Sequence, residues 1–297
     1  MALTLYVAPT WRTQVHEICD AHAGIVPVVK GNGYGFGRPR LFRICAELGV
    51  DLVAVGTIHE LGGAPVPALV LTPLSGAEVG LIDDTPVETV FTVSSVQQAL
   101  AIAGRRRAVV KLNSALGRYG ASPAERLEIE AILGSSVLGY SLHLPLDGGH
   151  LEAADLPDGA TLFVSHLSST PRISGLRVRQ RIGTRLWLGD KTNLRLRADV
   201  VEVRDVHEGD VAGYRRTPVA GEGTLVMVSA GSSHGVAMLP DGLSPFHFAR
   251  HRVAVHESPH MHTTMLWVPA HLPCPRPGDE VDVQQPLTRV WPDRVVW

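Results

Sequence analysis

Cysteine and charge are both scarce in this sequence of 297 residues. The three cysteines, Cys19, Cys45 and Cys274, form no CxxC pair, and their wide spacing predicts neither a disulfide framework nor a zinc site. We interpret them as ordinary thiols of a reducing compartment and expect a cytoplasmic protein. Charged residues make up 19% of the chain and hydrophobic residues 45%, a composition that excludes a disordered chain.

A bias toward one sign of charge and a long hydrophobic run are absent as well. Twenty-seven Lys and Arg residues oppose 29 Asp and Glu residues, for a formal net charge of −2, and the longest basic run is Arg105–Arg107. We therefore expect neither nucleic acid nor a membrane surface as a partner held by bulk charge. No apolar stretch approaches the roughly 18 residues that a membrane-spanning helix needs.

The first two thirds of the sequence alternate short apolar runs with helix-like segments. Strands are predicted at Ile25–Val29, Leu52–Val55, Ala68–Leu71, Thr89–Thr92, Ala108–Leu112, Val137–His143, Thr161–His166 and Ile182–Leu188. Helices are predicted at Trp11–His22, Pro39–Leu48, Ser94–Ala103 and Pro123–Leu133, the last two with Ser94 and Ser122 as N-caps. This alternation predicts an α/β fold with a (β/α)8 TIM barrel over residues 1–190, and a doubly wound open sheet is the alternative.

The pattern changes after Lys191. Strands with alternating hydrophobicity are predicted at Leu194–Val206, Thr224–Ser229, Arg252–Val255 and Thr263–Val268, separated by turns rich in glycine and proline. Helical periodicity is weak throughout this part. The sequence therefore predicts a smaller all-β domain over residues 191–297.

The most informative segment places a lysine at the end of an apolar strand. The run Val26-Pro-Val-Val-Lys30 leads into a loop with glycine at 31, 33, 35 and 37. In a barrel the carboxyl ends of the strands form the active-site face, and desolvation there lowers the pKa of a lysine and makes its amine a nucleophile able to form a Schiff base. From spacing alone, a lysine that simply reaches the solvent at the rim stays an alternative.

Val28-Val-Lys30-Gly-Asn-Gly-Tyr34-Gly-Phe-Gly37 resembles the cofactor lysine motif of the alanine racemase family, which are fold type III enzymes dependent on pyridoxal 5'-phosphate. The resemblance implies that Lys30 holds the cofactor as an imine and that Tyr34 reaches its phosphate. It also implies an isomerase that converts a small L-amino acid to the corresponding D-amino acid and back. The resemblance further implies a homodimer.

A second block, Val110–Gly120, resembles the segment that follows the fifth barrel strand in that family. The resemblance implies that Arg118 approaches the cofactor and binds the substrate carboxylate, for which its planar fork is suited. Lys111 stands where many family members carry a lysine that can be carbamylated to hold the arginine. Asn113-Ser-Ala-Leu116 replaces the family's Asp-Thr-Gly-Met, and without the other motifs Lys111 and Arg118 could equally be a solvent-exposed pair at a strand end.

Two histidines end predicted strands. His143 stands in the position of the family's cofactor-stacking histidine, and His166 begins a segment in which Ser169 replaces an asparagine and Thr170 supplies a hydroxyl to the phosphate. These roles are implied by the resemblance, because a histidine at a strand end is by itself more often a packed residue than a ligand.

Arg181-Ile-Gly183-Thr184 resembles the family segment that places an arginine at the pyridine nitrogen and two backbone amides at the phosphate. The resemblance assigns these roles to Arg181 and to Gly183 and Thr184. An arginine does not give up its proton, so it leaves the ring nitrogen mostly neutral and makes the ring a weaker electron sink. A weaker sink suits brief carbanion formation and limits transamination.

The second acid/base group departs from the family. A racemase needs one such group on each face of the bound substrate. The family uses the tyrosine of Gly-Tyr-Ala-Asp-Gly, supplied by the partner subunit, whereas this chain has Gly231-Ser232-Ser233-His234-Gly235. The hydroxyl of Ser232 is too weakly acidic for the task, so we predict His234 as the second catalytic group beside Lys30.

Two functions stay open on the sequence. The first is a racemase of alanine or another small amino acid, and the second is a cofactor-binding protein that does not racemise, acting as a single-base lyase or as a cofactor-holding or regulatory protein. The histidines between His256 and His262 lack the spacing of known metal sites, and no metal is expected.

Overall fold

The structure, a computed structural model, describes residues 2–145 and 155–297 and divides into two compact units. The barrel unit comprises Gln14–Gly31 and Arg38–Gly189, and the sheet unit comprises Met1–Thr13, Asn32–Gly37 and Asp190–Trp297. The division at residue 189 lies beside the expected boundary at 190. The start of the chain and the glycine-rich loop, however, group with the sheet unit.

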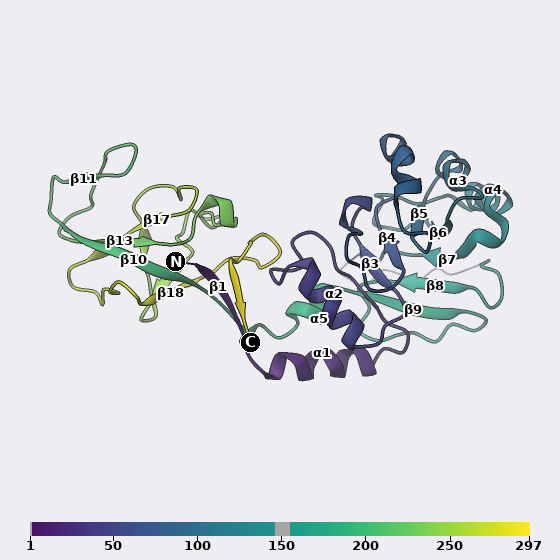
Figure 1. Cartoon of the computed structure of the whole chain (residues 1–297), viewed down its shortest axis with the longest axis horizontal. Coiled ribbons are helices and arrows are strands. Elements are labelled where there is room, and N and C mark those ends of the chain that lie inside the picture. Colours follow the sequence, from purple (N-terminus) through teal and green to yellow (C-terminus); the bar gives the residue numbers. More distant parts are fainter. Residues whose placement is uncertain (1, 146–154) are drawn as a thin grey trace. The chain divides into compact units, whose positions relative to one another are not determined.

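The barrel unit is built on eight parallel strands, in the hydrogen-bonded order β2-β9-β8-β7-β6-β5-β4-β3 (Figure 1). They are β2 (Val26–Pro27), β3 (Val53–Val55), β4 (Ala68–Val70), β5 (Val90–Val93), β6 (Arg107–Lys111), β7 (Val137–Ser141), β8 (Thr161–Val164) and β9 (Arg177–Ile182). A parallel bridge between Val28 and Ala54 joins the two outer members of this order. The predicted (β/α)8 barrel is confirmed, and the open sheet is not formed.

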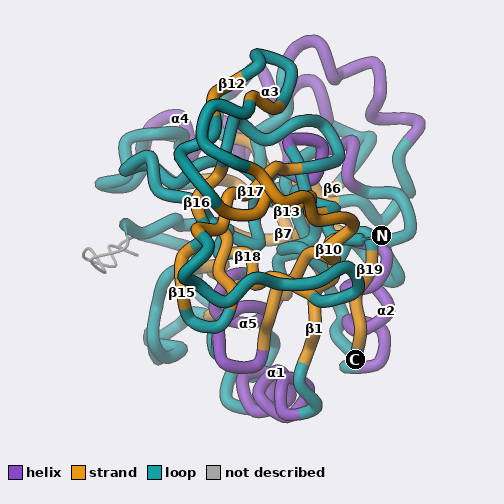
Figure 2. Tube along the Cα trace, turned by 90° about the vertical axis from the view of Figure 1, so that its left-hand side faces the viewer, coloured by secondary structure: helices purple, strands orange, loops and turns teal. Residues whose placement is uncertain are grey.

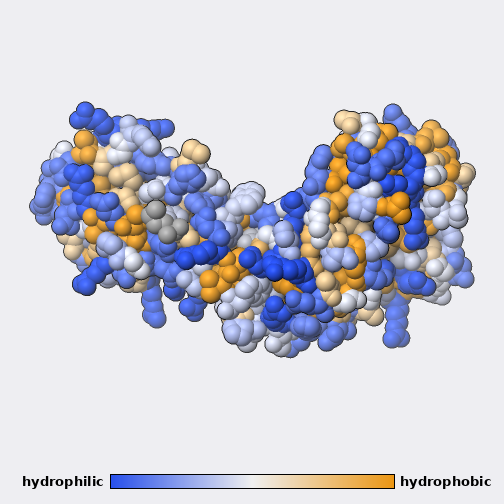
Figure 3. Space-filling model, in the orientation of Figure 1, coloured by the Kyte–Doolittle hydropathy of each residue, from blue (hydrophilic) through white to orange (hydrophobic). Residues whose placement is uncertain are grey.

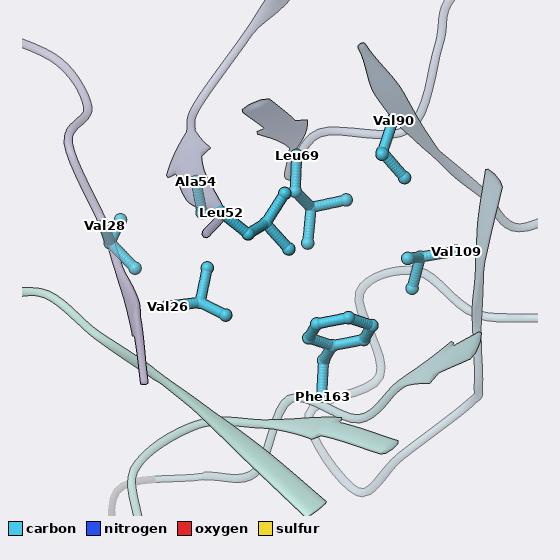
Figure 4. Close-up of a cluster of buried hydrophobic side chains, with 8 residues drawn as sticks. All are labelled: Val26, Val28, Leu52, Ala54, Leu69, Val90, Val109 and Phe163. Carbon is cyan, nitrogen blue, oxygen red and sulfur yellow. The ribbon is translucent and has the colours of Figure 1, made fainter. Parts of the chain in front are cut away.

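Apolar side chains fill the barrel interior. Figure 4 shows them pointing toward one another from successive strands. The cluster consists of Val26, Val28, Leu52, Ala54, Leu69, Val90, Val109 and Phe163, all buried. Because every second residue of a barrel strand faces inward, short strands of valine and leucine are sufficient to fill this space.

Helices and short 3-10 segments form part of the connections between the strands. The helices are α1 (Thr10–Asp20), α2 (Arg38–Glu47), α3 (Val96–Ile102), α4 (Pro123–Leu133) and α5 (Thr184–Leu188), with short 3-10 segments at Ile58–Glu60, Gly76–Asp84, Gly134–Ser136, Lys191–Asn193 and Ser232–His234. Ser122 caps α4 as predicted, accepting the Glu125 N–H at 3.3 Å. The prediction for α3 was wrong by one residue, since Ser95 accepts the Gln98 N–H at 3.4 Å.

The last barrel strand also differs from the prediction. The strand β9 ends at Ile182, and the segment expected to continue it forms α5 instead. Three arginines disguise the strand. One of them, Arg179, donates to Gly24 O at 2.7 Å and to the carboxylate of Asp51 at 3.1 Å, and its guanidinium lies 5.7 Å from the ring of the core residue Phe163. Their alternation with valine, glutamine and isoleucine carries a weak strand signal, although Gln180, Arg181 and Ile182 are buried.

The sheet unit holds a nine-stranded sheet in the order β15-β14-β18-β10-β13-β17-β16, with β1 pairing to β10 and β19 (Figure 2). The strands are β1 (Leu3–Val7), β10 (Leu194–Val206), β13 (Gly223–Val228), β14 (Phe246–Phe248), β15 (His251–Arg252), β16 (Ala254–Val255), β17 (Thr264–Pro269), β18 (Glu280–Val283) and β19 (Arg294–Val296), and a separate hairpin joins β11 (Val211–Ala212) to β12 (Thr217–Pro218). The predicted all-β character is confirmed. The sequence analysis missed β1, whose partner in β10 begins near Leu194.

Hydrophobic residues on the face drawn in Figure 3 occur in patches separated by hydrophilic ones. Among the described residues, no helix has both the length and the apolar character that crossing a membrane requires.

Candidate active site

Lys30 is held by the backbone that leads to it. The Val29 N–H donates to Ala54 O at 2.7 Å, and the indole N–H of Trp187 in α5 donates to Val28 O at 2.8 Å. These contacts come from the neighbouring strand and from the helix after β9. The lysine therefore leaves the carboxyl end of β2 from a fixed position at the barrel mouth.

The surroundings of Lys30 favour its neutral amine. Desolvation is the largest cause that lowers the pKa of Lys30, and the cations of Arg118 and Arg181 lower it further. The carboxylate of Glu60 opposes the shift. A lysine whose pKa is lowered in this way carries more of the unprotonated amine that attacks a carbonyl.

Glu60 is a site residue that the sequence analysis missed. Its carboxylate accepts the Gly31 N–H at 2.9 Å and the Gly56 N–H at 2.7 Å, which joins the loop after Lys30 to the loop after β3. A side chain at position 56 would place its Cβ 2.9 Å from this carboxylate. The available signal was a glycine directly after a buried strand with a carboxylate four residues later.

Arg181 is buried at the end of β9. One terminal N–H donates to Leu142 O at 2.9 Å, whereas its Nε has no hydrogen-bond partner among the described residues. Burial lowers the pKa of Arg181 to about 10, so the guanidinium stays protonated at neutral pH. A buried N–H without an acceptor is rare in proteins and fits a ligand atom that accepts a hydrogen bond.

His143 follows β7 and is neutral. Its Nδ1 lies 3.0 Å from Ser165 Oγ, and its ring lies 4.6 Å from the ring of His166. Burial first, and then the cation of Arg181, lower the pKa of His143 to about 3. The side chain therefore offers an uncharged aromatic ring, which suits stacking on a flat cofactor.

Lys111 ends β6 and is buried with cations as neighbours. Desolvation, followed by Arg181 and Arg118, lowers the pKa of Lys111 to about 7. Arg118 lies in the exposed loop beyond, with its guanidinium 5.2 Å from the ring of Tyr119. The mouth thus gathers cationic groups, an arrangement that favours anionic ligands such as carboxylate or phosphate.

We expect Lys111 to make stability depend on pH. An unfolded lysine keeps its proton up to about pH 10.4, whereas folded Lys111 loses it near 7. Between these values the unfolded chain binds more protons, so the free energy of unfolding rises with pH, and this gain is absent below about pH 7.

The variant Lys111→Met removes this contribution. The variant's free energy of unfolding minus that of the parent should be larger at about pH 6.5 than at about pH 9, by roughly 2–3 kcal/mol, because only the parent gains stability as the pH rises. Denaturant titrations of both proteins at the two pH values measure the difference. A difference that is the same at both values would show that Lys111 is not desolvated.

The loops after β8 and β9 lie at the same end of the barrel. The guanidinium of Arg185 donates to Ser168 O at 2.7 Å, and so ties the first turn of α5 to the loop that carries Ser169 and Thr170. The Thr170 hydroxyl accepts from the Gln180 amide at 3.1 Å. Gly183 and Thr184 begin α5 on this side. Loops in these positions commonly form phosphate sites in barrels, and the phosphate roles of the four residues stay predictions.

Two predicted site residues lie in the sheet unit. Tyr34 is buried, with the unusual backbone angle φ of 56°. His234 belongs to the 3-10 segment Ser232–His234, where its Nδ1 accepts the Gly231 N–H at 3.1 Å and its Nε2 lies 3.2 Å from the Asp293 carboxylate. Their predicted roles in phosphate binding and proton transfer stay predictions.

The histidine-rich segment between residues 256 and 262 makes local contacts. His260 bonds the carboxylate of Glu257, which also accepts the Tyr214 N–H at 2.9 Å. Within residues 2–145 and 155–297, no group of three or more His, Cys, Asp or Glu side chains is arranged to hold a metal ion.

Comparison with known proteins places the chain in a family. Residues 11–158 match the family described as "Alanine racemase, N-terminal domain". The alanine racemase of Desulforamulus reducens is 30% identical over 145 residues, which cover 44% of this chain and 39% of that protein. The chain belongs to the alanine racemase family.

Other alanine racemases extend the likeness along the chain. That of Sorangium cellulosum is 25% identical over 307 residues, covering 86% of this chain and 79% of the relative. A crystal structure of alanine racemase from Bartonella henselae with covalently bound pyridoxal phosphate has a TM-score of 0.73 at 15% identity and covers 97% of this chain and 91% of that one. The match to the D. reducens racemase spans about two fifths of that protein's length.

Proposed function

We propose that this member of the alanine racemase family is a pyridoxal 5'-phosphate-dependent enzyme that interconverts the enantiomers of alanine or another small amino acid. The observation that carries the proposal is that the buried cation of Arg181 lies close enough to Lys30, at the barrel mouth, to lower its pKa. Lys30 has a lowered pKa, and Arg181 is buried with an Nε that lacks an acceptor among the described residues.

The residues present fit this cofactor. Lys30 would bind its aldehyde, the neutral ring of His143 would stack on its pyridine face, and the orphan Nε of Arg181 would donate to its ring nitrogen. Its phosphate would be held by Tyr34, Ser169, Thr170 and the backbone amides of Gly183 and Thr184. When bound, the cofactor supplies an electron sink that makes the α-proton of an attached amino acid acidic.

The chain itself positions the substrate and moves the proton. Arg118 would bind the substrate carboxylate through its planar guanidinium. Lys30, with its amine partly neutral, would accept or return the α-proton on one face. Glu60 holds the loop that carries this lysine, because its carboxylate bonds Gly31 and Gly56. Arg181 would keep the ring nitrogen unprotonated, which limits transamination.

The opposite face needs a second group, for which the sequence predicts His234. We propose that the chain forms a homodimer in which the turn at residues 231–235 serves the barrel mouth of the partner subunit. A cytoplasmic location belongs to the same proposal, and its support is that Cys19, Cys45 and Cys274 are all free thiols.

A specific observation favours a second candidate function. Ser232 replaces the family tyrosine, and both ring nitrogens of His234 face groups of its own domain. A chain without a second acid/base group would bind the cofactor and act on one face only, as a single-base lyase or as a cofactor-holding protein.

One experiment separates these functions. The purified chain is incubated with the cofactor, its absorption spectrum is recorded, and a panel of small L-amino acids is followed by chiral chromatography. We expect a new visible absorption band and conversion of L-alanine or another small amino acid to its enantiomer. A band without conversion of any amino acid would select the second candidate, and the absence of a band would reject both.

A further inference from the structure

The turn at residues 231–235 is docked on the turn that follows His260. The Ser232 N–H donates to His260 O at 2.7 Å, and the Ser233 N–H donates to Met261 O at 2.9 Å. A Cβ at Gly231 would lie 2.2 Å from His260 O, so a larger residue does not fit there without moving the backbone. The two turns therefore pack together as a pair, and this pair of turns carries His262 as well as His234.

His234 has no free lone pair in this arrangement. A backbone N–H is always a donor, so the Nδ1 that receives the Gly231 N–H at 3.1 Å is unprotonated. The ring proton of neutral His234 is therefore on Nε2, which faces the Asp293 carboxylate at 3.2 Å. Accepting a substrate proton at Nδ1 would require His234 to lose its bond to Gly231.

His262 is held in the opposite tautomer. Ser233 Oγ lies 2.5 Å from Met261 O, and since a carbonyl has no proton, the single hydroxyl proton of Ser233 must point there. The contact of 3.0 Å between Ser233 Oγ and His262 Nδ1 is then donated by the histidine. Its Nε2 keeps a free lone pair, with no hydrogen-bond partner in the part of the chain that the structure describes.

We infer that His262 is the second acid/base residue and that Ser233 and His234 position it. The inference rests on the proposed racemase function. The side chain of His262 is exposed, and the centre of its ring lies 6.0 Å from that of His234 within the pair of turns. Nε2 of His262 accepts the α-proton of the substrate, the electron pair of the broken C–H bond stays with the cofactor-bound substrate, and the reverse step returns a proton to carbon.

Matched histidine-to-glutamine variants test this assignment. Glutamine at 234 can still accept from Gly231 and donate to Asp293, so His234→Gln should keep more than about a tenth of the racemisation rate. Glutamine at 262 cannot accept a proton, so His262→Gln should lose at least about 100-fold, the usual scale of general acid/base catalysis. His251→Gln, at an exposed position of β15, is the control that should match the parent.

Two further measurements separate a catalytic role from a structural one. His262→Gln should still bind the cofactor and exchange the α-proton of one enantiomer with deuterated solvent, because Lys30 still serves its own face. Nuclear magnetic resonance of the protein labelled with isotopic nitrogen in histidine should show the proton of His262 on Nδ1 and that of His234 on Nε2. The signal that disappears in each glutamine variant identifies the histidine that was replaced.

The outcomes distinguish the inference from the function beneath it. If the parent racemises and His262→Gln racemises at a similar rate, or if the proton of His262 is on Nε2, the inference is overturned while the racemase function stands. A larger loss in His234→Gln than in His262→Gln would return the role to His234. If the parent racemises no amino acid, the proposed function itself fails.

Discussion

Replacing Lys30 by arginine is expected to lower racemisation at least about 1,000-fold and to remove the covalent attachment of the cofactor. Arginine keeps the positive charge at the barrel mouth, but its guanidinium does not become a nucleophile near neutral pH. The parent, incubated with cofactor and reduced with borohydride, should carry a pyridoxyl group on Lys30 in peptide mass mapping. The variant should carry none.

The lysine content of the chain makes this test sharp. The sequence contains only Lys30, Lys111 and Lys191, so three peptides account for every lysine. Lys191→Arg, outside the barrel unit, is the matched control and should label and racemise like the parent. A pyridoxyl group on Lys111 or Lys191 in the parent would refute the assignment of Lys30.

Replacing Arg181 by glutamate should change the outcome of the reaction. A carboxylic acid at the ring nitrogen would share its proton with that nitrogen and strengthen the electron sink. We expect racemisation to fall about 100-fold or more, because a preorganised charged donor is lost from a buried site. Formation of the α-keto acid by transamination should rise in the same samples, as measured by coupled dehydrogenase assay.

The control for this variant is on the same strand. Arg177 begins β9 with an exposed side chain, so Arg177→Glu makes the same change of charge away from the barrel mouth. It should leave both reactions as in the parent. An Arg181→Glu protein that folds, binds the cofactor and keeps the ratio of racemisation to transamination would remove Arg181 from the ring nitrogen.

The sequence predicted the barrel strands well where their side chains are apolar on both faces. The runs that became β3 to β8 are buried throughout most of their length, which makes them visible as short continuous hydrophobic segments. It failed at β9, where arginines interrupt the hydrophobic pattern, and at β1, whose partner strands β10 and β19 lie far from it in the sequence.

By itself, the sequence determined the order of the barrel strands β2 to β8 and the chemical groups that follow or end strands, such as Lys30 and Arg181, because these are local patterns. Only the tertiary structure decided that Glu60 bonds two loops beside Lys30, that Arg181 is buried with an orphan N–H, and which nitrogen carries the proton in His234 and in His262. These properties depend on donors and acceptors contributed by residues far apart in the chain, such as Met261 beside Ser233, and hydrogen bonds of that kind exist only once the chain has folded.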